Sequence, residues 1–303
     1  MSPALRRWEP VAAAGLGALQ TLALVHTQAW ALPLAALAWL AWRLDAAIPR
    51  RAAWLGWCFG TAWLAATVWW MFISMHRYGG LPAPLAASAV FALSAALSLY
   101  LALACAAYAR WRSGRWTDAL LFAGLWLLAE LARGLLFTGF PWGASGYSQV
   151  DSPLAALAPW LGVYGMGAVL ALAAAAAVRV LLTSPRQWQG LALALGLVIA
   201  ATVAPQEFSQ PAGEFRVALL QTHVKQDEKF TAERMPETLA WLARELMSAQ
   251  ADLVVAPETA VPLLPLQLRD FAPGYWEMLV EHFAAPGRAA LVGVPLEIGR
   301  AHV

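Results

Sequence analysis

Glu258 is the residue whose sequence surroundings suit catalysis best. It follows residues 252–256, Asp-Leu-Val-Val-Ala, a short apolar run that predicts a buried strand ended by Pro257. In open α/β sheets, reacting groups gather beyond the carboxyl ends of the strands. A carboxylate at such a strand end can act as a general base, although an exposed or capping Glu is the more common case. Glu258 is therefore the candidate catalytic residue.

Other reactive side chains do not form a second centre by their spacing. Cys58 and Cys105 lie within long apolar runs, where a thiol is a poor nucleophile, so core packing explains both. The five His residues are scattered without the spacing of metal ligands. The sequence therefore predicts neither a metal site nor another cofactor.

The elements around Glu258 predict an α/β layer in the C-terminal third. Short apolar runs predict strands at 216–221, 252–256 and 289–295. The segments between them predict helices at 233–249 and 275–283. An alternation of strand, helix, strand, helix and strand favours neighbouring parallel strands.

The rest of the chain has the composition of a membrane protein. Of its 303 residues, 61% are hydrophobic and 13% charged, with a mean hydropathy of +0.58. Soluble domains average about 25% charged residues, so an ordinary soluble protein is excluded. A transmembrane helix needs about 20 mainly apolar residues. Seven runs approach that length: 10–25, 30–44, 52–75, 83–109, 117–137, 154–182 and 188–204. The first and last are short, so six or eight spans are alternatives, and the first could be a signal peptide.

The distribution of Arg residues predicts how the spans are oriented. Residues 1–204 hold 12 Arg and no Lys against five acidic residues, whereas 205–303 hold eight basic and 13 acidic residues. With the N-terminus inside, ten Arg fall in cytoplasmic segments and only Arg77 and Arg133 fall outside, as the positive-inside rule expects. An odd number of spans then places the acidic C-terminal segment outside the cytoplasm. Nucleic-acid binding is excluded, because the basic residues lie at span ends.

One pair of charged residues lies inside a predicted span. Glu130 and Arg133 are three positions apart in the run 117–137, so they can pair on one helix face. Because an isolated charge inside the bilayer is costly, the favoured role is a structural ion pair.

The loop that follows this pair is a candidate lipid-contacting segment. Residues 137–149 combine Gly, aromatic and hydroxyl side chains without a charge. This composition is typical either of a loop that lines a groove for lipid chains or of a packed connector. Phe140, Trp142 and Tyr147 are its candidate contacts, and His76 in an earlier outer loop is a candidate contact for a phospholipid headgroup.

Four stretches of sequence carry a specific family pattern. They are Trp70 with Tyr-Gly-Gly-Leu-Pro at 78–82, Glu-Leu-Ala-Arg-Gly at 130–134 with Thr-Gly-Phe-Pro-Trp at 138–142, Gly-Tyr-Ser-Gln-Val-Asp-Ser-Pro-Leu at 146–154, and Leu-Leu-Gln-Thr at 219–222 with Ala-Pro-Glu-Thr-Ala at 256–260. With these stretches in order along nearly its whole length, the chain resembles the apolipoprotein N-acyltransferases of the bacterial inner membrane. The resemblance implies a polytopic α-helical bundle of about seven spans, followed by an incomplete α/β nitrilase-like (αββα) domain in the periplasm.

The resemblance also implies a two-step acyl transfer by a monomer without a cofactor. In the family, a Cys thiolate attacks an ester of a membrane phospholipid and forms a thioester. The acyl chain then passes to the α-amino group of a diacylglyceryl-cysteine at the N-terminus of an apolipoprotein. By resemblance, Glu258 is the general base and Phe230 the aromatic residue near the site, although packing explains Phe230 equally well.

The chain departs from the family pattern at its reactive residues. The family's nucleophilic Cys and its Lys lie well downstream of the Glu, and neither has a counterpart up to Val303. Lys225 and Lys229 precede Glu258 and stand on the wrong side for the family's Lys. We therefore expect the chain as given to be an inactive fragment.

The predicted organisation has three parts. Residues 1–205 form the transmembrane domain, 206–297 form the N-terminal part of the nitrilase-like domain, and 298–303 form a tail that can be back-translated to a sequencing adapter. Two other functions stay open. One is a membrane-tethered nitrilase-like amidase, and the other is a non-enzymatic receptor or transporter with an extracytoplasmic cap.

Overall fold

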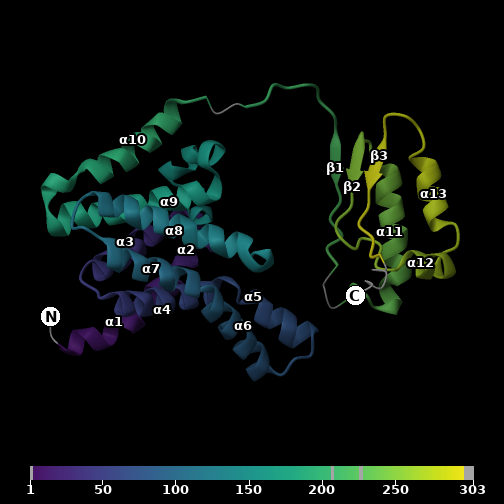
Figure 1. Cartoon of the computed structure of the whole chain (residues 1–303). Helices are drawn as coiled ribbons and strands as arrows, with labels where there is room; N and C mark the ends of the chain where they lie inside the picture. The colour runs from purple at the N-terminus through teal and green to yellow at the C-terminus, as the bar shows by residue number, and fades with distance from the viewer. Residues whose placement is uncertain (1–2, 206–207, 225–227, 297–303) are drawn as a thin grey trace. The chain divides into compact units, whose positions relative to one another are not determined.

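The computed structural model describes residues 3–205, 208–224 and 228–296. The chain divides into two compact units, Met1–Phe208 and Ser209–Val303. Figure 1 shows a helical first unit and a second unit that combines strands with helices. The tail predicted at 298–303 lies outside the described residues.

Helices build the described part of the first unit (Figure 1). They are α1 (Pro3–Gln20), α2 (Leu22–Val25), α3 (Ala31–Asp45), α4 (Pro49–Thr67), α5 (Trp70–Ile73), α6 (Ala83–Leu97), α7 (Leu99–Trp111), α8 (Thr117–Leu135), α9 (Ala158–Val178) and α10 (Gln189–Val203). Short 3₁₀ or π-helical turns link some of them. One such turn, Ser145–Gln149, follows the loop that leaves α8.

Fewer helices meet the length of a membrane span than the sequence predicts. Within the described residues, four helical segments are long and apolar enough to cross a membrane: Arg7–Val25, Ala83–Trp111, Thr117–Thr138 and Pro153–Leu182. The pair Pro49–Thr67 and Trp70–Tyr78, bent by 53°, makes a fifth if it is one span. Helices α3 and α10, which fall in two other predicted spans, have only 15 residues each. At 1.5 Å per residue each is about 22 Å long, shorter than the roughly 30 Å hydrocarbon core.

A buried ion cluster joins the ends of three helices. Glu9 in α1 pairs with Arg43 near the end of α3 and with Arg51 near the start of α4. Arg51 Nε donates to Glu9 Oε2 at 3.0 Å, and Glu9 is only 6% exposed. These are helix ends that the Arg pattern assigns to one side of the membrane, and the structure brings them into contact.

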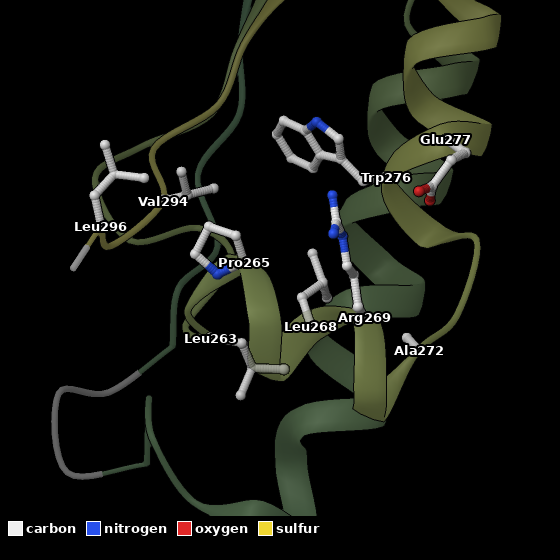
Figure 2. A pocket seen from close by; sticks show the side chains of 9 residues that line it. All are labelled: Leu263, Pro265, Leu268, Arg269, Ala272, Trp276, Glu277, Val294 and Leu296. Carbon is white, nitrogen blue, oxygen red and sulfur yellow. The ribbon is translucent and has the colours of Figure 1, made fainter.

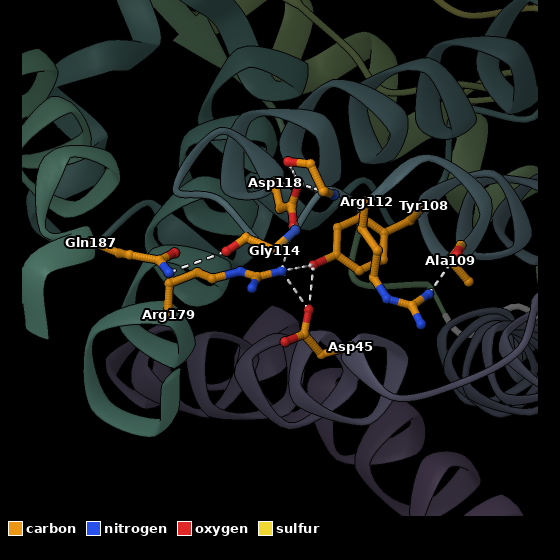
Figure 3. A network of polar contacts seen from close by, with 9 residues as sticks. Asp45, Tyr108, Ala109, Arg112, Gly114, Asp118, Arg179 and Gln187 are labelled. Atoms are coloured by element: carbon orange, nitrogen blue, oxygen red, sulfur yellow. Dashed lines mark hydrogen bonds and ion pairs between the residues drawn. The ribbon is translucent and has the colours of Figure 1, made fainter. Parts of the chain in front are cut away.

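A second buried cluster lies at the ends of α3, α7, α8 and α9 (Figure 3). Arg179, directly after α9, contacts Asp45 at 2.5 Å, Asp118 at 2.6 Å and the Tyr108 hydroxyl at 3.3 Å. The Tyr108 hydroxyl donates to Asp45 at 3.2 Å, and Asp118 also accepts the backbone N–H of Gly114 at 2.7 Å. One guanidinium thus ties together four helix ends.

The second unit contains a parallel three-stranded sheet, as the alternation of strands and helices predicts. Strands β1 (Val217–Leu219), β2 (Leu253–Val255) and β3 (Ala289–Leu291) lie side by side in that order (Figure 1). In the register, Ala218 faces Val254 and Val254 faces Ala290. The strands are shorter than the predicted runs, although the backbone of Ala256 still donates to Leu291 O beyond the end of β2.

Helices α11 (Met235–Ser248), α12 (Pro265–Phe271) and α13 (Tyr275–His282) complete the described second unit. Leu242 and Leu246 of α11 are fully buried in one hydrophobic cluster with Val254 of β2, so α11 packs on the sheet. The Tyr275 hydroxyl donates to Leu239 O at 2.9 Å, and burial raises the pKa of this phenol to about 12. Helix α12, which has seven residues and begins at a Pro, was not predicted from the sequence.

Candidate functional site

Glu258 lies where the sequence predicts it, three residues after β2, and its side chain is exposed. The backbone around it is held on both sides. Val261 N–H donates to Gly293 O at 3.3 Å, and Thr259 adopts the left-handed conformation with φ of 55°. A Cβ at Gly293 would lie 2.7 Å from Glu258 Cα, so only a Gly there lets the chain after β3 approach this closely. The structure thus presents a carboxylate at the carboxyl edge of the sheet.

Lys229 connects a second loop to this position. Its ammonium donates a hydrogen bond to the backbone O of Glu258 at 2.9 Å. The next residue, Phe230, has 59% of its surface exposed. The contact brings the loop that bears the candidate aromatic residue next to the loop that bears the candidate base. Sequence reasoning gave Lys229 no role, because the contact spans 29 positions and uses a backbone oxygen that no motif marks.

A separate pocket of about 290 Å³ opens in the second unit (Figure 2). Figure 2 shows an apolar lining interrupted by the charged side chains of Arg269 and Glu277. The lining residues are Leu263, Pro265, Leu268, Arg269, Ala272, Trp276, Glu277, Val294 and Leu296. Glu258 is not one of them, so this pocket does not contain the candidate base.

In the first unit, the predicted pairing of Glu130 with Arg133 is present. Arg133 Nη2 lies 3.8 Å from Glu130 Oε1, and both residues are 4% exposed. Each side chain has closer partners in the loop after α8. Glu130 accepts hydrogen bonds from the backbone N–H of Ser145 at 2.7 Å and from its hydroxyl at 3.1 Å. Arg133 Nη1 donates to the backbone O of Phe140 at 3.1 Å and to that of Trp142.

The candidate lipid contacts of this loop are only partly brought together. The rings of Phe140 and Trp142 lie 5.2 Å apart between centroids. Trp142 and Tyr147 are each about half exposed, at 52% and 53%, whereas Phe140 is half-buried. His76 is exposed in the π-helical turn Ser74–Tyr78, where its Nδ1 lies 2.8 Å from Leu81 O. Its described contacts are with its own segment.

An apolar groove of about 430 Å³ lies on the helical unit. Helices α3, α9 and α10 supply most of its walls, through residues such as Leu34, Leu170 and Leu195. Gln149 and Ser152 also line it. Gln149 is buried and its amide donates to Trp30 O at 3.1 Å, so the turn Ser145–Gln149 at the end of the aromatic loop reaches this groove.

Comparison with known proteins decides the family. Residues 16–176 match the family model described as the apolipoprotein N-acyltransferase N-terminal domain, which is more than half of the chain. The chain belongs to the apolipoprotein N-acyltransferase family. The matched segment includes Glu130, Arg133 and the loop 137–149, which confirms the resemblance drawn from these residues.

Curated apolipoprotein N-acyltransferases match most of the chain. The chain is 48% identical to that of Verminephrobacter eiseniae over 288 residues, covering 88% of this chain and 53% of the relative. Identity to that of Ralstonia nicotianae is 40%, covering 86% and 51%. Identity to that of Pseudomonas syringae pv. tomato is 38%, covering 92% and 56%. The chain therefore spans about half the length of the curated apolipoprotein N-acyltransferases it matches.

Two residues that complete the buried centre around Glu130 were not predicted from the sequence. Ser145 bonds Glu130, and the indole N–H of Trp126 donates to the Ser145 hydroxyl at 3.1 Å. The sequence held one indication of such partners. The carboxylate of Glu130, inside a predicted span, can accept more hydrogen bonds than Arg133 alone can donate to it. The hydroxyls of the following Gly-rich loop are among the uncharged donors that could meet the excess.

Proposed function

We propose that this chain provides the membrane unit and the first part of the catalytic unit of an apolipoprotein N-acyltransferase. Family membership supports the activity, and the position of Glu258 at the carboxyl edge of a parallel sheet supports its role as the base. That position is the single structural observation on which the catalytic assignment depends.

In the proposed reaction, Glu258 takes the proton of a Cys thiol as the thiolate attacks an ester carbonyl of a phospholipid. As the ester bond breaks, the leaving oxygen takes the proton back from Glu258, so a lysophospholipid departs and the acyl chain stays on the enzyme as a thioester. The free α-amino group of a diacylglyceryl-cysteine then attacks the thioester and releases the thiol as an amide forms. Sequence downstream of Val303 in the complete protein would supply the Cys and the Lys that stabilises the carbonyl oxygen as it gains charge.

The aromatic residues would serve the lipid chains. The loop after α8 carries the aromatic residues Phe140, Trp142 and Tyr147. Trp and Tyr side chains are suited to the boundary between acyl chains and headgroups. Phe230 would cover the acyl chain near Glu258, and His76 would contact a phosphate headgroup. In this proposal the enzyme is a monomer without a metal or other cofactor.

The proposed topology has seven spans, with the N-terminus in the cytoplasm and the second unit in the periplasm of a bacterial inner membrane. It counts α3 and α10 as short spans. The contacts of Glu9 and of Arg179 support this topology. Each joins helix ends that the Arg pattern predicts to lie on the cytoplasmic side.

The orientation can be tested with reporters placed after Gln210. We expect alkaline phosphatase fused there to be active and green fluorescent protein fused there to be dark, because the first folds only outside the cytoplasm and the second only within it. The same pair fused after Arg112 is expected to give the opposite result. A bright fluorescent fusion after Gln210 would contradict the seven-span arrangement.

The proposed activity can be tested by comparing the chain with the complete gene. We expect residues 1–303 to form no acyl-enzyme with phospholipid, because Cys58 is partly and Cys105 fully buried. The product of a gene recovered beyond residue 297 should form a hydroxylamine-sensitive thioester and transfer the acyl chain to a diacylglyceryl lipopeptide. Hydrolysis of a simple amide, without acyl transfer from lipid, would support the amidase instead. A thioester on Cys58 or Cys105 would refute the expectation for the short chain.

A further inference from the structure

The buried pair in α8 directs its hydrogen bonds to the loop rather than to each other. The closest contact between the two side chains is 3.8 Å, which is an ion pair but longer than a hydrogen bond. Glu130 accepts both donors of Ser145, and Arg133 donates to the carbonyl oxygens of Phe140 and Trp142. The two charges therefore hold the two ends of the segment 140–145.

Two further features constrain the path of the loop. The loop turns through Phe137, Thr138 and Gly139, all of which have positive φ. Gly167 of α9 lies against the centre, because a Cβ there would stand 2.9 Å from Glu130 Oε2 and would meet the Ser145 hydroxyl. The loop is thus fixed between α8 and α9.

The same segment carries exposed aromatic side chains. Trp142 is itself held through its backbone O, and Tyr147 lies two residues beyond Ser145; both side chains are about half exposed. A pair needed only to neutralise itself gains little over an apolar pair of the same volume. Retaining two charges in an apolar bundle is explained if both are needed for the backbone of this loop.

We propose that Glu130 and Arg133 are positioning residues that set the loop 140–147 so that Trp142 and Tyr147 engage the ester-linked acyl chains of a glycerolipid. The proposal rests on the proposed function for the identity of the lipid. Such chains occur in both substrates, the phospholipid donor and the diacylglyceryl acceptor. The order of the loop itself is independent of either substrate.

The first test separates positioning from simple charge balance. In E130Q, Arg133 is left without its counter-charge, and we expect both a lower melting temperature and faster amide exchange at 140–147. In the double variant E130Q/R133L no unpaired charge remains, so the melting temperature should largely recover. Exchange at 140–147 should stay about tenfold or more faster than in the wild type, since hydrogen bonds to charged groups are lost.

Two controls, E9Q and G124A, and one further test variant, G167A, accompany these variants. E9Q removes another buried carboxylate of the same unit and should leave exchange at 140–147 unchanged. G167A adds a Cβ against Glu130 Oε2 and should loosen the loop without altering any charge. G124A in α8, where a Cβ would meet nothing within 4 Å, should have no effect. The glycine pair keeps the test decisive if E130Q does not fold.

A second readout uses the complete protein and a KM-against-kcat comparison for each substrate. Loosening the loop is expected to raise KM for the phospholipid or for the diacylglyceryl lipopeptide at least about tenfold, with a smaller change in kcat, and the affected substrate identifies the engaged lipid. Normal exchange at 140–147 in E130Q/R133L and in G167A would overturn the proposal, as would a loosened loop with unchanged KM for both substrates. If the wild-type complete protein forms no thioester, the proposed function fails, whereas the exchange result still decides whether the pair positions the loop.

Discussion

Glu258→Gln in the complete protein is expected to slow acyl-enzyme formation by about 10²–10⁴-fold, the usual contribution of a general base. The amide keeps the shape of the side chain but cannot take the proton of the nucleophile. The fold should be unaffected, because the side chain is exposed and the described contact to Lys229 uses the backbone oxygen of residue 258. Single-turnover measurement with a labelled phospholipid gives the rate.

The matched control is Glu281→Gln, an exposed carboxylate on α13 in the same unit. It should form the thioester at the wild-type rate. Both variants should show the same melting temperature. Thioester formation at the normal rate by Glu258→Gln would remove this residue from the mechanism and leave its position at the sheet edge without catalytic meaning.

Arg179→Met is expected to lower the free energy of unfolding of the helical unit by ~3–5 kcal/mol, because removing one member of a buried charge network leaves the others uncompensated. Arg179 is 3% exposed, and it contacts Asp45 and Asp118, of which Asp118 is 2% exposed (Figure 3). Chemical unfolding of the purified protein in detergent, followed by circular dichroism, measures the loss.

Arg186→Met serves as the control for that loss. Arg186 is exposed in the 3₁₀ turn Pro185–Gln187, so its removal should change the free energy of unfolding little. Adding Asp118→Asn to Arg179→Met should recover part of the stability, since one buried negative charge is then removed. Equal stabilities for Arg179→Met and the wild type would show that the network in Figure 3 does not hold the helix ends together.

Local patterns in the sequence predicted much of the second unit. The runs that contain β1, β2 and β3 are apolar, and their alternation with helices favoured the parallel order that the structure has. The short helix α12 was missed because its seven residues cover fewer than two turns, too few for an apolar period to stand out from its surroundings. The predicted runs extend past the three-residue strands, although single backbone hydrogen bonds continue there, from Leu220 to Val255 O and from Ala256 to Leu291 O.

In the helical unit, the contacts between residues far apart in the sequence could not be predicted. The pairing of Glu130 with Arg133 follows from their spacing, but the bonds to Ser145 and Phe140 depend on how the loop folds back. The Arg179 cluster joins residues from four helices, and no local pattern encodes it. The predicted spans at 30–44 and 188–204 contain helices of 15 residues, because a run of apolar residues limits the length of a helix without determining where its ends fray or bend.

The wide separation of Asp45 and Arg179 along the chain has a consequence for biosynthesis. They are 134 positions apart, and at a translation rate of about 5–20 residues per second the ribosome needs roughly 7–27 s to make the second after the first. During that interval Asp45 has entered the insertion machinery while its guanidinium partner does not yet exist. The contact between Asp45 and Arg179, which ties the ends of α3 and α9, can therefore form only late in synthesis.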